Sequence, residues 1–379
     1  MSKTIVPSLL VLLFSACGST TPANSSPDLA AGGNPGSGGV PGTGGVAATG
    51  GAFAMGGATT STGGALSSGT TTAAWRPFSD DSPWNTPIGP NPTIDPNSKT
   101  LIADWQTSSP YGEHLDVNIK GYSIPVFYAD ATTPTYTVLA DVGGFGWSGK
   151  NGQNTTGSMP IPDQAAPDPE SDHHLLVIDK LQMKEWGCWN MVHETAGWHA
   201  GLCATSDLKG TGVRPLAEGN PTWYTSAGAR ACGFPLVAGL IRPDEIQAGR
   251  IDHALVVAYP HIRAGFYTPP ASTAQAANGS GAQKDRGIPC GGRIQYDPSI
   301  NLDTLNLSRS GRIIMQALQE YGAYVGDFSG AMSLYGDGSP DAQAYWNSGA
   351  LGTYELQNKI SLADFRVIKL GTLYDNGNG

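Results

Sequence analysis

The amino-acid composition changes abruptly at Trp75, and this change most constrains how the chain can fold. Residues 18–74 consist mainly of Gly, Ser, Thr, Ala and Pro, and Asp28 is the charged residue among them. Such a segment cannot bury enough apolar surface to offset its conformational entropy, so we expect a flexible tether over residues 17–74. A Gly-rich coil of this length reaches roughly 40 Å from end to end. Residues 75–379 are then expected to form a single globular, catalytic domain.

Residues 1–16 read as a signal peptide. Lys3 precedes the apolar run VPSLLVLLFSA, which is too short to span a bilayer and ends in small residues. The last four positions, FSAC, resemble a bacterial lipobox. That resemblance implies a lipidated Cys17, and Gly18 after it implies the outer membrane or the cell surface. A simple cleaved signal peptide is the alternative.

The charge balance argues against two classes of partner. The formal net charge is −10, and the chain has no basic run or Arg-rich stripe. Nucleic acid and anionic membrane surfaces are therefore not expected to bind the folded body. We expect a monomer whose contact with a membrane is made through the lipid anchor only.

Four cysteines follow Cys17. An even number of cysteines in an exported chain favours disulfides over metal or redox roles. Four cysteines allow three pairings, and the sequence leaves the choice open. We favour Cys188–Cys203 with Cys232–Cys290, because the first pair closes a short, self-contained loop.

Short runs rich in Val, Ile, Leu and aromatic residues predict strands. These runs are residues 122–129, 136–142, 173–180, 253–259 and 365–371. Long segments rich in Gly and Pro, such as residues 143–172, are expected to be loops. The pattern predicts a mostly β fold of β-sandwich-like antiparallel sheets, with one or two short helices and long Gly/Pro loops.

Residues 308–324 predict the clearest helix, because Ile313, Leu318 and Tyr321 fall on one stripe and Ser308 can cap its start. Shorter helices are expected over residues 100–106 and 242–249. In the latter, Asp244 and Glu245 lie near the positive end of the helix dipole. That position explains both carboxylates structurally, so we do not expect them to be catalytic.

Four segments are similar to a group of uncharacterised secreted bacterial proteins of about this length. The segments are DSPWNTPI (81–88), MPIPDQAAPDPESDHHLLVID (159–179), GLIRPDEIQAGRIDHAL (239–255) and GGRIQYDPSINLD with ALQEYGAYVGD (within 291–327). The resemblance implies a single exported domain and implies no activity.

Residues 188–203, CWNMVHETAGWHAGLC, predict the wall of a binding site. Two cysteines bracket two histidines, a glutamate and two tryptophans there, and we expect a disulfide-closed loop. An aromatic side chain on an exposed loop can stack on sugar rings, while polar neighbours bind the hydroxyls. The residues predicted to bind a polysaccharide are Trp198, Trp147, Tyr224, Arg242 and Arg293.

The catalytic residues are predicted from clustered histidines and carboxylates. A glycoside hydrolase needs two carboxylates, for which Asp172, Glu194 and Asp252 are candidates. A lyase needs a His or Tyr base and a cation that neutralises the substrate carboxylate. We expect polysaccharide cleavage by one of these routes, with His199 and His253 as acid and base, and with Asp252, Glu194 and His173 as further catalytic residues.

Two alternatives stay open. The first is a non-catalytic carbohydrate-binding or adhesion module, for which a tether and aromatic loops suffice. The second is a metal held by His173 or His174 together with His199 and His253, although no cofactor is expected. HETAGWH differs from a zinc-protease motif because its histidines are six residues apart and Gly197 interrupts the helix.

Overall fold

The structure is a computed structural model that describes residues 74–144, 152–214, 228–277 and 281–376. The expected signal peptide, the lipidated Cys17 and almost all of the tether lie outside the described residues. Two predicted substrate-binding residues, Trp147 and Tyr224, also lie outside them.

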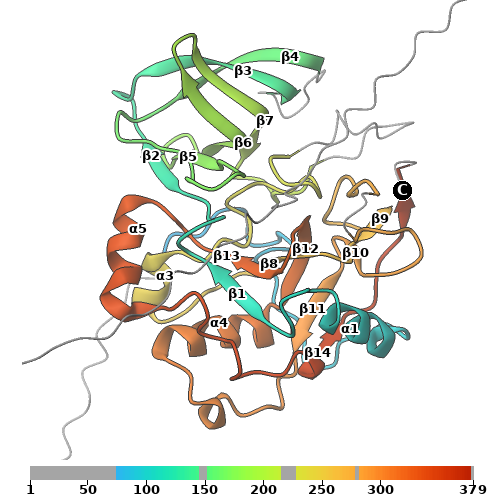
Figure 1. The fold of residues 1–379 in the computed structure, drawn as a ribbon. Helices are drawn as coiled ribbons and strands as arrows, with labels where there is room; N and C mark the ends of the chain where they lie inside the picture. Colours follow the sequence, from blue (N-terminus) through green and yellow to red (C-terminus); the bar gives the residue numbers. More distant parts are fainter. Residues whose placement is uncertain (1–73, 145–151, 215–227, 278–280, 377–379) are drawn as a thin grey trace, which may run out of the picture. The chain divides into compact units, whose positions relative to one another are not determined.

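The first of two six-stranded sheets is built from residues 126–207 (Figure 1). Its strand order is β2-β5-β6-β7-β3-β4, in which β2 pairs with β5 and β3 with β7 in parallel and the other neighbours are antiparallel. The strands are β2 (Val126–Ala129), β3 (Thr135–Gly144), β4 (Gly152–Pro160), β5 (Leu175–Asp179), β6 (Lys184–Glu194) and β7 (Gly197–Asp207).

The second sheet has the order β1-β13-β8-β12-β11-β14, and a third, small sheet has the order β10-β9-β15. The strands of the second sheet are β1 (Leu115–Asn118), β8 (Leu255–Tyr259), β11 (Arg293–Tyr296), β12 (Ala323–Phe328), β13 (Met332–Tyr335) and β14 (Phe365–Val367). Those of the third are β9 (Arg263–Tyr267), β10 (Pro289–Cys290) and β15 (Tyr374–Asp375). The prediction of a mostly β fold is confirmed.

The helices of the described residues are short, and three of the four lie where helices were predicted. The helix over residues 340–345 was not predicted, and residues 323 and 324 of the predicted helix belong to β12 instead. The helices are α1 (Ser98–Gln106), α3 (Pro243–Ala248), α4 (Arg309–Glu320) and α5 (Pro340–Tyr345), with single turns η1 (Leu302–Leu305), η2 (Trp346–Ala350) and η3 (Leu362–Asp364). The side chain of Ser308 caps α4 by accepting the amide of Gly311, and Gly249 ends α3 with a positive φ of 90°. Among the described residues, no helix is long and apolar enough to cross a bilayer.

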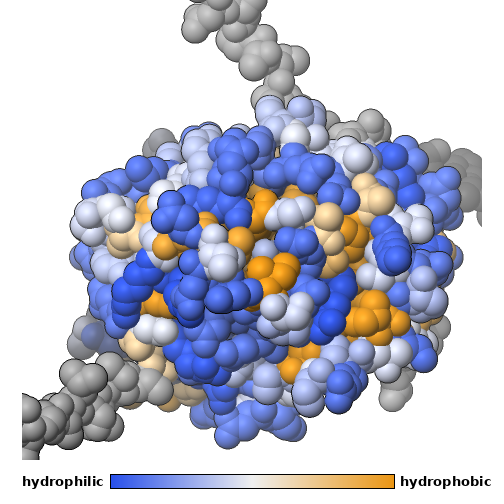
Figure 2. Space-filling model, turned by 90° about the horizontal axis from the view of Figure 1, so that it is seen from below, coloured by the Kyte–Doolittle hydropathy of each residue, from blue (hydrophilic) through white to orange (hydrophobic). Residues whose placement is uncertain are grey.

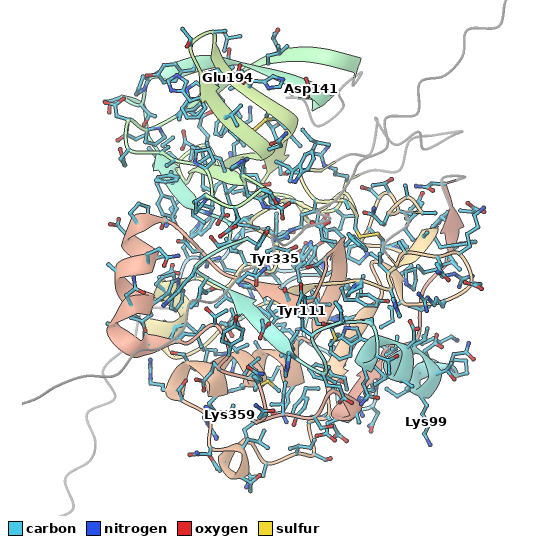
Figure 3. The ribbon with its side chains drawn as sticks, in the orientation of Figure 1. Lys99, Tyr111, Asp141, Glu194, Tyr335 and Lys359 are labelled. Atoms are coloured by element: carbon cyan, nitrogen blue, oxygen red, sulfur yellow. A yellow bond between two sulfur atoms is a disulfide. The ribbon has the colours of Figure 1, made fainter. Side chains whose placement is uncertain are left out.

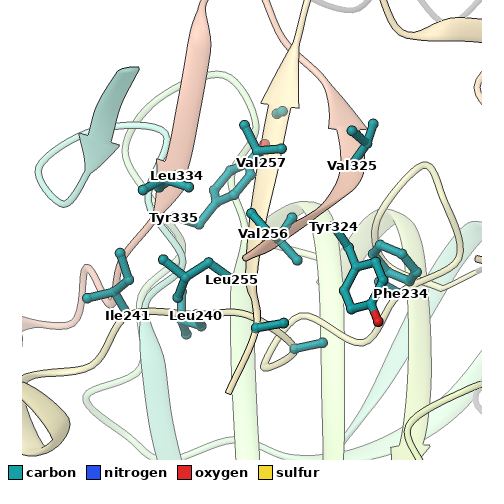
Figure 4. Packing of buried hydrophobic residues seen from close by; sticks show 14 of the residues in the cluster. Phe234, Leu240, Ile241, Leu255, Val256, Val257, Tyr324, Val325, Leu334 and Tyr335 are labelled. Atoms are coloured by element: carbon teal, nitrogen blue, oxygen red, sulfur yellow. The ribbon is translucent and has the colours of Figure 1, made fainter. Parts of the chain in front are cut away.

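Strands β5 and β8 are buried along their whole length, β5 between two hydrophobic cores and β8 inside the larger of them. Leu175 and Val177 of β5 face a core inside the first sheet, whereas Leu176 and Ile178 join a larger core with the second sheet. The larger core gathers Val256 and Val257 of β8 with residues of β12 and β13 (Figure 4). A strand covered on both faces reads as a continuous apolar run, as both of these do.

Both favoured disulfides, Cys188–Cys203 and Cys232–Cys290, are present. Two predicted loops, however, contain strands. The segment 143–172 includes β4, and the stretch 188–203 belongs to two paired strands, β6 and β7. On the face shown in Figure 2, apolar residues occur as separate small groups among polar ones, which is usual for a protein surface.

Candidate functional site

Strands β6 and β7 form a long hairpin whose tip carries several of the predicted site residues. Cys188 pairs directly with Cys203 across the hairpin, with their Cα atoms 4.1 Å apart, and the disulfide joins them. Glu194 pairs with Gly197, so only Thr195 and Ala196 connect the strands. Regular pairing and a covalent cross-link give the tip a defined geometry.

One side of the hairpin tip presents an aromatic surface. Trp198 lies directly opposite His193, and the two rings are stacked with their centroids 4.4 Å apart and their planes at 19°. They line a hollow of about 320 Å³, together with Tyr136 of β3, which is 40% exposed, and Asp163. This volume is at the lower end of the usual range for small-molecule sites, roughly 300–1,000 Å³.

The other side of the tip carries a histidine–carboxylate pair. His199 Nε2 lies 2.8 Å from Asp141 Oδ1, and both side chains are solvent-accessible. A second hollow, of about 310 Å³, is lined by Leu139, Glu194, Ala196, Gly197, Trp198 and His199. Glu194 and Asp141 lie at the same end of the first sheet (Figure 3). When Nε2 donates to Asp141, the carboxylate fixes the imidazole tautomer and leaves Nδ1 able to accept a proton.

Trp198 therefore separates two adjacent hollows. We call this region the hairpin site and define it by eight residues: Tyr136, Leu139, Asp141, Asp163, His193, Glu194, Trp198 and His199. Three of the predicted residues, Trp198, His199 and Glu194, meet here. Tyr136, Asp141 and His193 were not predicted. The alternating pattern of YTVLADV could have predicted the positions of two of them, because it places Tyr136 and Asp141 on opposite faces of β3.

His253 and Arg242 do not lie in the hairpin site. His253 precedes β8 of the second sheet, and its ring nitrogens bond to Glu245 Oε1 at 2.8 Å and to the carbonyl of Ala254 at 3.0 Å. Arg242 is equally buried and binds Glu245 at 2.9 Å. Burial raises the pKa of Glu245, but Arg242 and His253 outweigh it and hold the pKa below its usual value. This network fastens α3 to the second sheet.

The other predicted residues have structural contacts of their own. Asp252 forms an ion pair with Arg250, and His173 bonds through Nδ1 to the carbonyl of Asp168 at 2.9 Å. Arg293 donates to the carbonyls of Tyr321 and Thr86, each at 2.8 Å. Burial lowers the pKa of Arg293. None of these contacts involves a residue of the hairpin site.

The histidines considered for a metal have different partners. His199 binds Asp141 and His253 binds Glu245, while His174 is buried. Burial, followed by the charge of Arg230, lowers the pKa of His174 to about 3, so this imidazole is neutral. Within the described residues, no three His, Cys, Asp or Glu side chains are arranged to hold a metal ion.

Comparison with protein-family models, with curated proteins and with solved structures finds no match to this chain. Function is therefore inferred from the geometry of the hairpin site itself.

Proposed function

We propose that the protein binds a polysaccharide at the hairpin site. The observation that carries this proposal is the position of Trp198, whose ring stacks on His193 and borders a hollow on each side. A flat aromatic surface suits the C–H face of a sugar ring, and carboxylates and imidazoles nearby can bind its hydroxyls. Two adjoining hollows fit neighbouring residues of one glycan chain.

We further propose that the protein is exported and is anchored by a lipid at the outer membrane or the cell surface. Two buried disulfides support an oxidising compartment. An anchored tether would hold the hairpin site away from the membrane, where extracellular polysaccharide is available. A polysaccharide is the partner; nucleic acid is not expected, and neither is a second copy of the chain.

Replacing Trp198 by Ala is expected to lower polysaccharide affinity about 10- to 100-fold, which corresponds to roughly 1.5–3 kcal/mol for a buried aromatic contact. Binding is measured on a glycan array and then by titration with the best ligand. Tyr354→Ala is the matched control, because Tyr354 is an aromatic residue that is 67% exposed and lies outside the hairpin site. Equal losses in both variants, or none in Trp198→Ala, would refute the proposal.

Cleavage of the bound polysaccharide is a second candidate function, favoured by the 2.8 Å contact between His199 and Asp141. A histidine oriented by a carboxylate can act as a general base, as in lyase chemistry. The hydrolase route needs a carboxylate pair instead.

If His199 is the base, His199→Ala is expected to slow product release about 100-fold or more while binding is kept. Unsaturated uronic products and reducing ends are measured from a polysaccharide panel. His261→Ala is the matched control, because His261 pairs with Asp104 at 3.0 Å outside the hairpin site. Equal rates for wild type and His199→Ala would remove His199 from the mechanism.

A further inference from the structure

The hairpin site carries negative charge on both sides of Trp198. The described residues that line its two hollows all come from three stretches of the chain, residues 136–141, 161–167 and 193–199. These stretches contain three carboxylates, Asp141, Asp163 and Glu194, and neither Lys nor Arg. A glycan that enters the two hollows therefore meets carboxylates with no cation beside them in the same stretches.

Each hollow is lined by one exposed carboxylate. Asp163 follows β4 and lines the first hollow with Trp198, whereas Glu194 lines the second hollow beside His199. Within the part of the chain that the structure describes, the side chains of Asp163 and Glu194 form no hydrogen bond or ion pair. Each is therefore placed to accept a charge-assisted hydrogen bond from a cationic group of a ligand.

Asp141 adds a third negative charge beside the second hollow. Its Oδ1 lies 2.8 Å from Nε2 of His199, a residue that lines this hollow, and half of the Asp141 side chain is solvent-accessible. Asp141 and Glu194 lie at the same end of the first sheet (Figure 3). The second hollow thus has one carboxylate in its wall and another directly behind that wall.

The basic residue of the hairpin lies too far from this tip to balance the charge. Lys184 begins β6 and pairs with Asp207 at the end of β7, and β6 runs for 11 residues from Lys184 to Glu194. A strand of that length spans roughly 33 Å. Salt screens exposed charges beyond about 8 Å at physiological ionic strength, so Lys184 does not offset the carboxylates of the tip.

The aromatic side chains of the site favour a ligand of the same charge. Trp198 stacks on His193, and Tyr136, which is 40% exposed, lines the first hollow with both of them. The face of an indole or phenol ring attracts cations, most strongly in the case of Trp. A sugar that carries an ammonium group can therefore contact the ring and pair with a carboxylate at the same time, whereas a uronate is repelled by the carboxylates.

We propose that the polysaccharide recognised by the hairpin site is an amino-sugar polymer with free amino groups. This inference rests on the proposed function and names the class of glycan for the same site. Ammonium groups on neighbouring sugars would pair with Asp163 and Glu194, with Trp198 between them against a sugar ring. A sugar amine that binds beside a carboxylate is held in its protonated form.

The class of glycan also bears on the cleavage considered above. β-Elimination requires a uronate whose carboxylate is neutralised by a cation, and the stretches that line the hollows contain no Lys or Arg for that role. An amino-sugar polymer is therefore a ligand of the hairpin site and not a substrate for the lyase route through His199.

The test is titration of the full chain with three oligosaccharides of equal length: a hexosamine oligomer with free amines, its N-acetylated form and a hexuronate oligomer. At low salt the free-amine oligomer is expected to bind about 10-fold more tightly than the N-acetylated one, because each exposed ion pair contributes up to about fivefold. The hexuronate oligomer should bind most weakly. Raising the salt to about 0.5 M should remove most of the preference for free amines.

Substitution of the carboxylates assigns this preference to the site. Asp163→Asn and Glu194→Gln are each expected to reduce the preference for free amines about threefold, and the double variant should abolish it. Asp285→Asn is the matched control, because Asp285 is an exposed carboxylate outside the hairpin site. This variant should keep the full preference.

Equal affinity of wild type for the free-amine and N-acetylated oligomers would overturn the amino-sugar assignment, and so would a preference that persists in the double variant. Tighter binding of the hexuronate oligomer, with or without added Ca²⁺, would overturn it as well and would favour the lyase route. If Trp198→Ala still lowers affinity in those cases, the hairpin site remains the glycan-binding surface. Wild type that binds none of the three oligomers and no glycan on the array would overturn both proposals.

Discussion

Replacing Cys232 and Cys290 by Ala is expected to lower the free energy of unfolding by about 4 kcal/mol. A disulfide restricts the unfolded chain, and the gain increases with the length of the closed loop. Cys232 and Cys290 are 58 residues apart, and the loop between them contains β8 and β9. The same principle assigns about 3 kcal/mol to Cys188–Cys203, which closes 15 residues.

Denaturant unfolding of both double variants measures this difference. All four sulfur atoms belong to buried residues, so the loss of packing on substitution by Ala is similar for the two pairs. The Cys188→Ala/Cys203→Ala variant should unfold at a higher denaturant concentration than Cys232→Ala/Cys290→Ala, yet it should lose more glycan affinity because it loosens the hairpin. The reverse order of stability would contradict the loop-length argument.

Glu185→Gln is expected to remove part of the pH dependence of stability. Glu185 belongs to β6 and is 1% exposed, and its carboxylate accepts the amides of Leu236 at 3.0 Å and Val237 at 3.1 Å. Burial raises its pKa to about 7, although the two amides, Ser206 and Arg214 oppose this. Arg230 also interacts electrostatically with Glu185.

Proton linkage determines whether the free energy of unfolding rises or falls with pH. A carboxyl group with a higher pKa in the folded than in the unfolded chain binds protons more tightly when folded, so the free energy of unfolding falls as the pH rises from about 4.5 to about 7. The full shift corresponds to about 3 kcal/mol. Asp327, with a pKa of about 7, and Asp337, with a pKa of about 6, change stability in the same direction.

Unfolding curves at about pH 4.5 and about pH 8 test the linkage. Gln resembles protonated Glu, so Glu185→Gln should match wild type at the lower pH and exceed it by about 3 kcal/mol at the higher pH. Glu194→Gln is the control, because Glu194 is exposed. If Glu185→Gln instead lost the same stability at both pH values, the raised pKa of Glu185 would be contradicted. The hydrogen bonds to Glu185 would then favour its ionised form.

Most of the fold could be predicted because apolar runs and helix-capping residues in the sequence coincide with the buried strands and the helix ends of the structure. LLVID and LVVAY are continuous apolar runs, and both became strands covered on two faces. The start of α4 at Ser308 and the end of α3 at Gly249 follow from capping chemistry that is local in sequence. The disulfide pairing was favoured on loop length alone, and both pairs occur.

The β6–β7 hairpin was mistaken for a loop because its alternation breaks at Asn190. Trp186 and Cys188 face the core inside the first sheet, and so does Met191, although it is an odd number of residues away. Asn190 has a positive φ of 52°, which allows the buried face to change there. A strand that switches faces has no single two-residue period for a sequence to display.

The candidate sites depend on contacts between distant segments. His253 and Arg242 have residue types suited to catalysis, but only the fold reveals that both bind Glu245. Asp141 was not considered because its partner, His199, belongs to another strand of the sheet.

The most direct test of the central claim is the indole N–H spectrum of the protein during titration with a bound oligosaccharide. Substitution of single tryptophans assigns the signals. The signal of Trp198 is expected to shift in a saturable manner, while that of Trp84, which is 1% exposed, stays unchanged. A saturable shift confined to other tryptophans, with the Trp198 signal unmoved, would contradict the assignment of the hairpin site as the polysaccharide-binding surface.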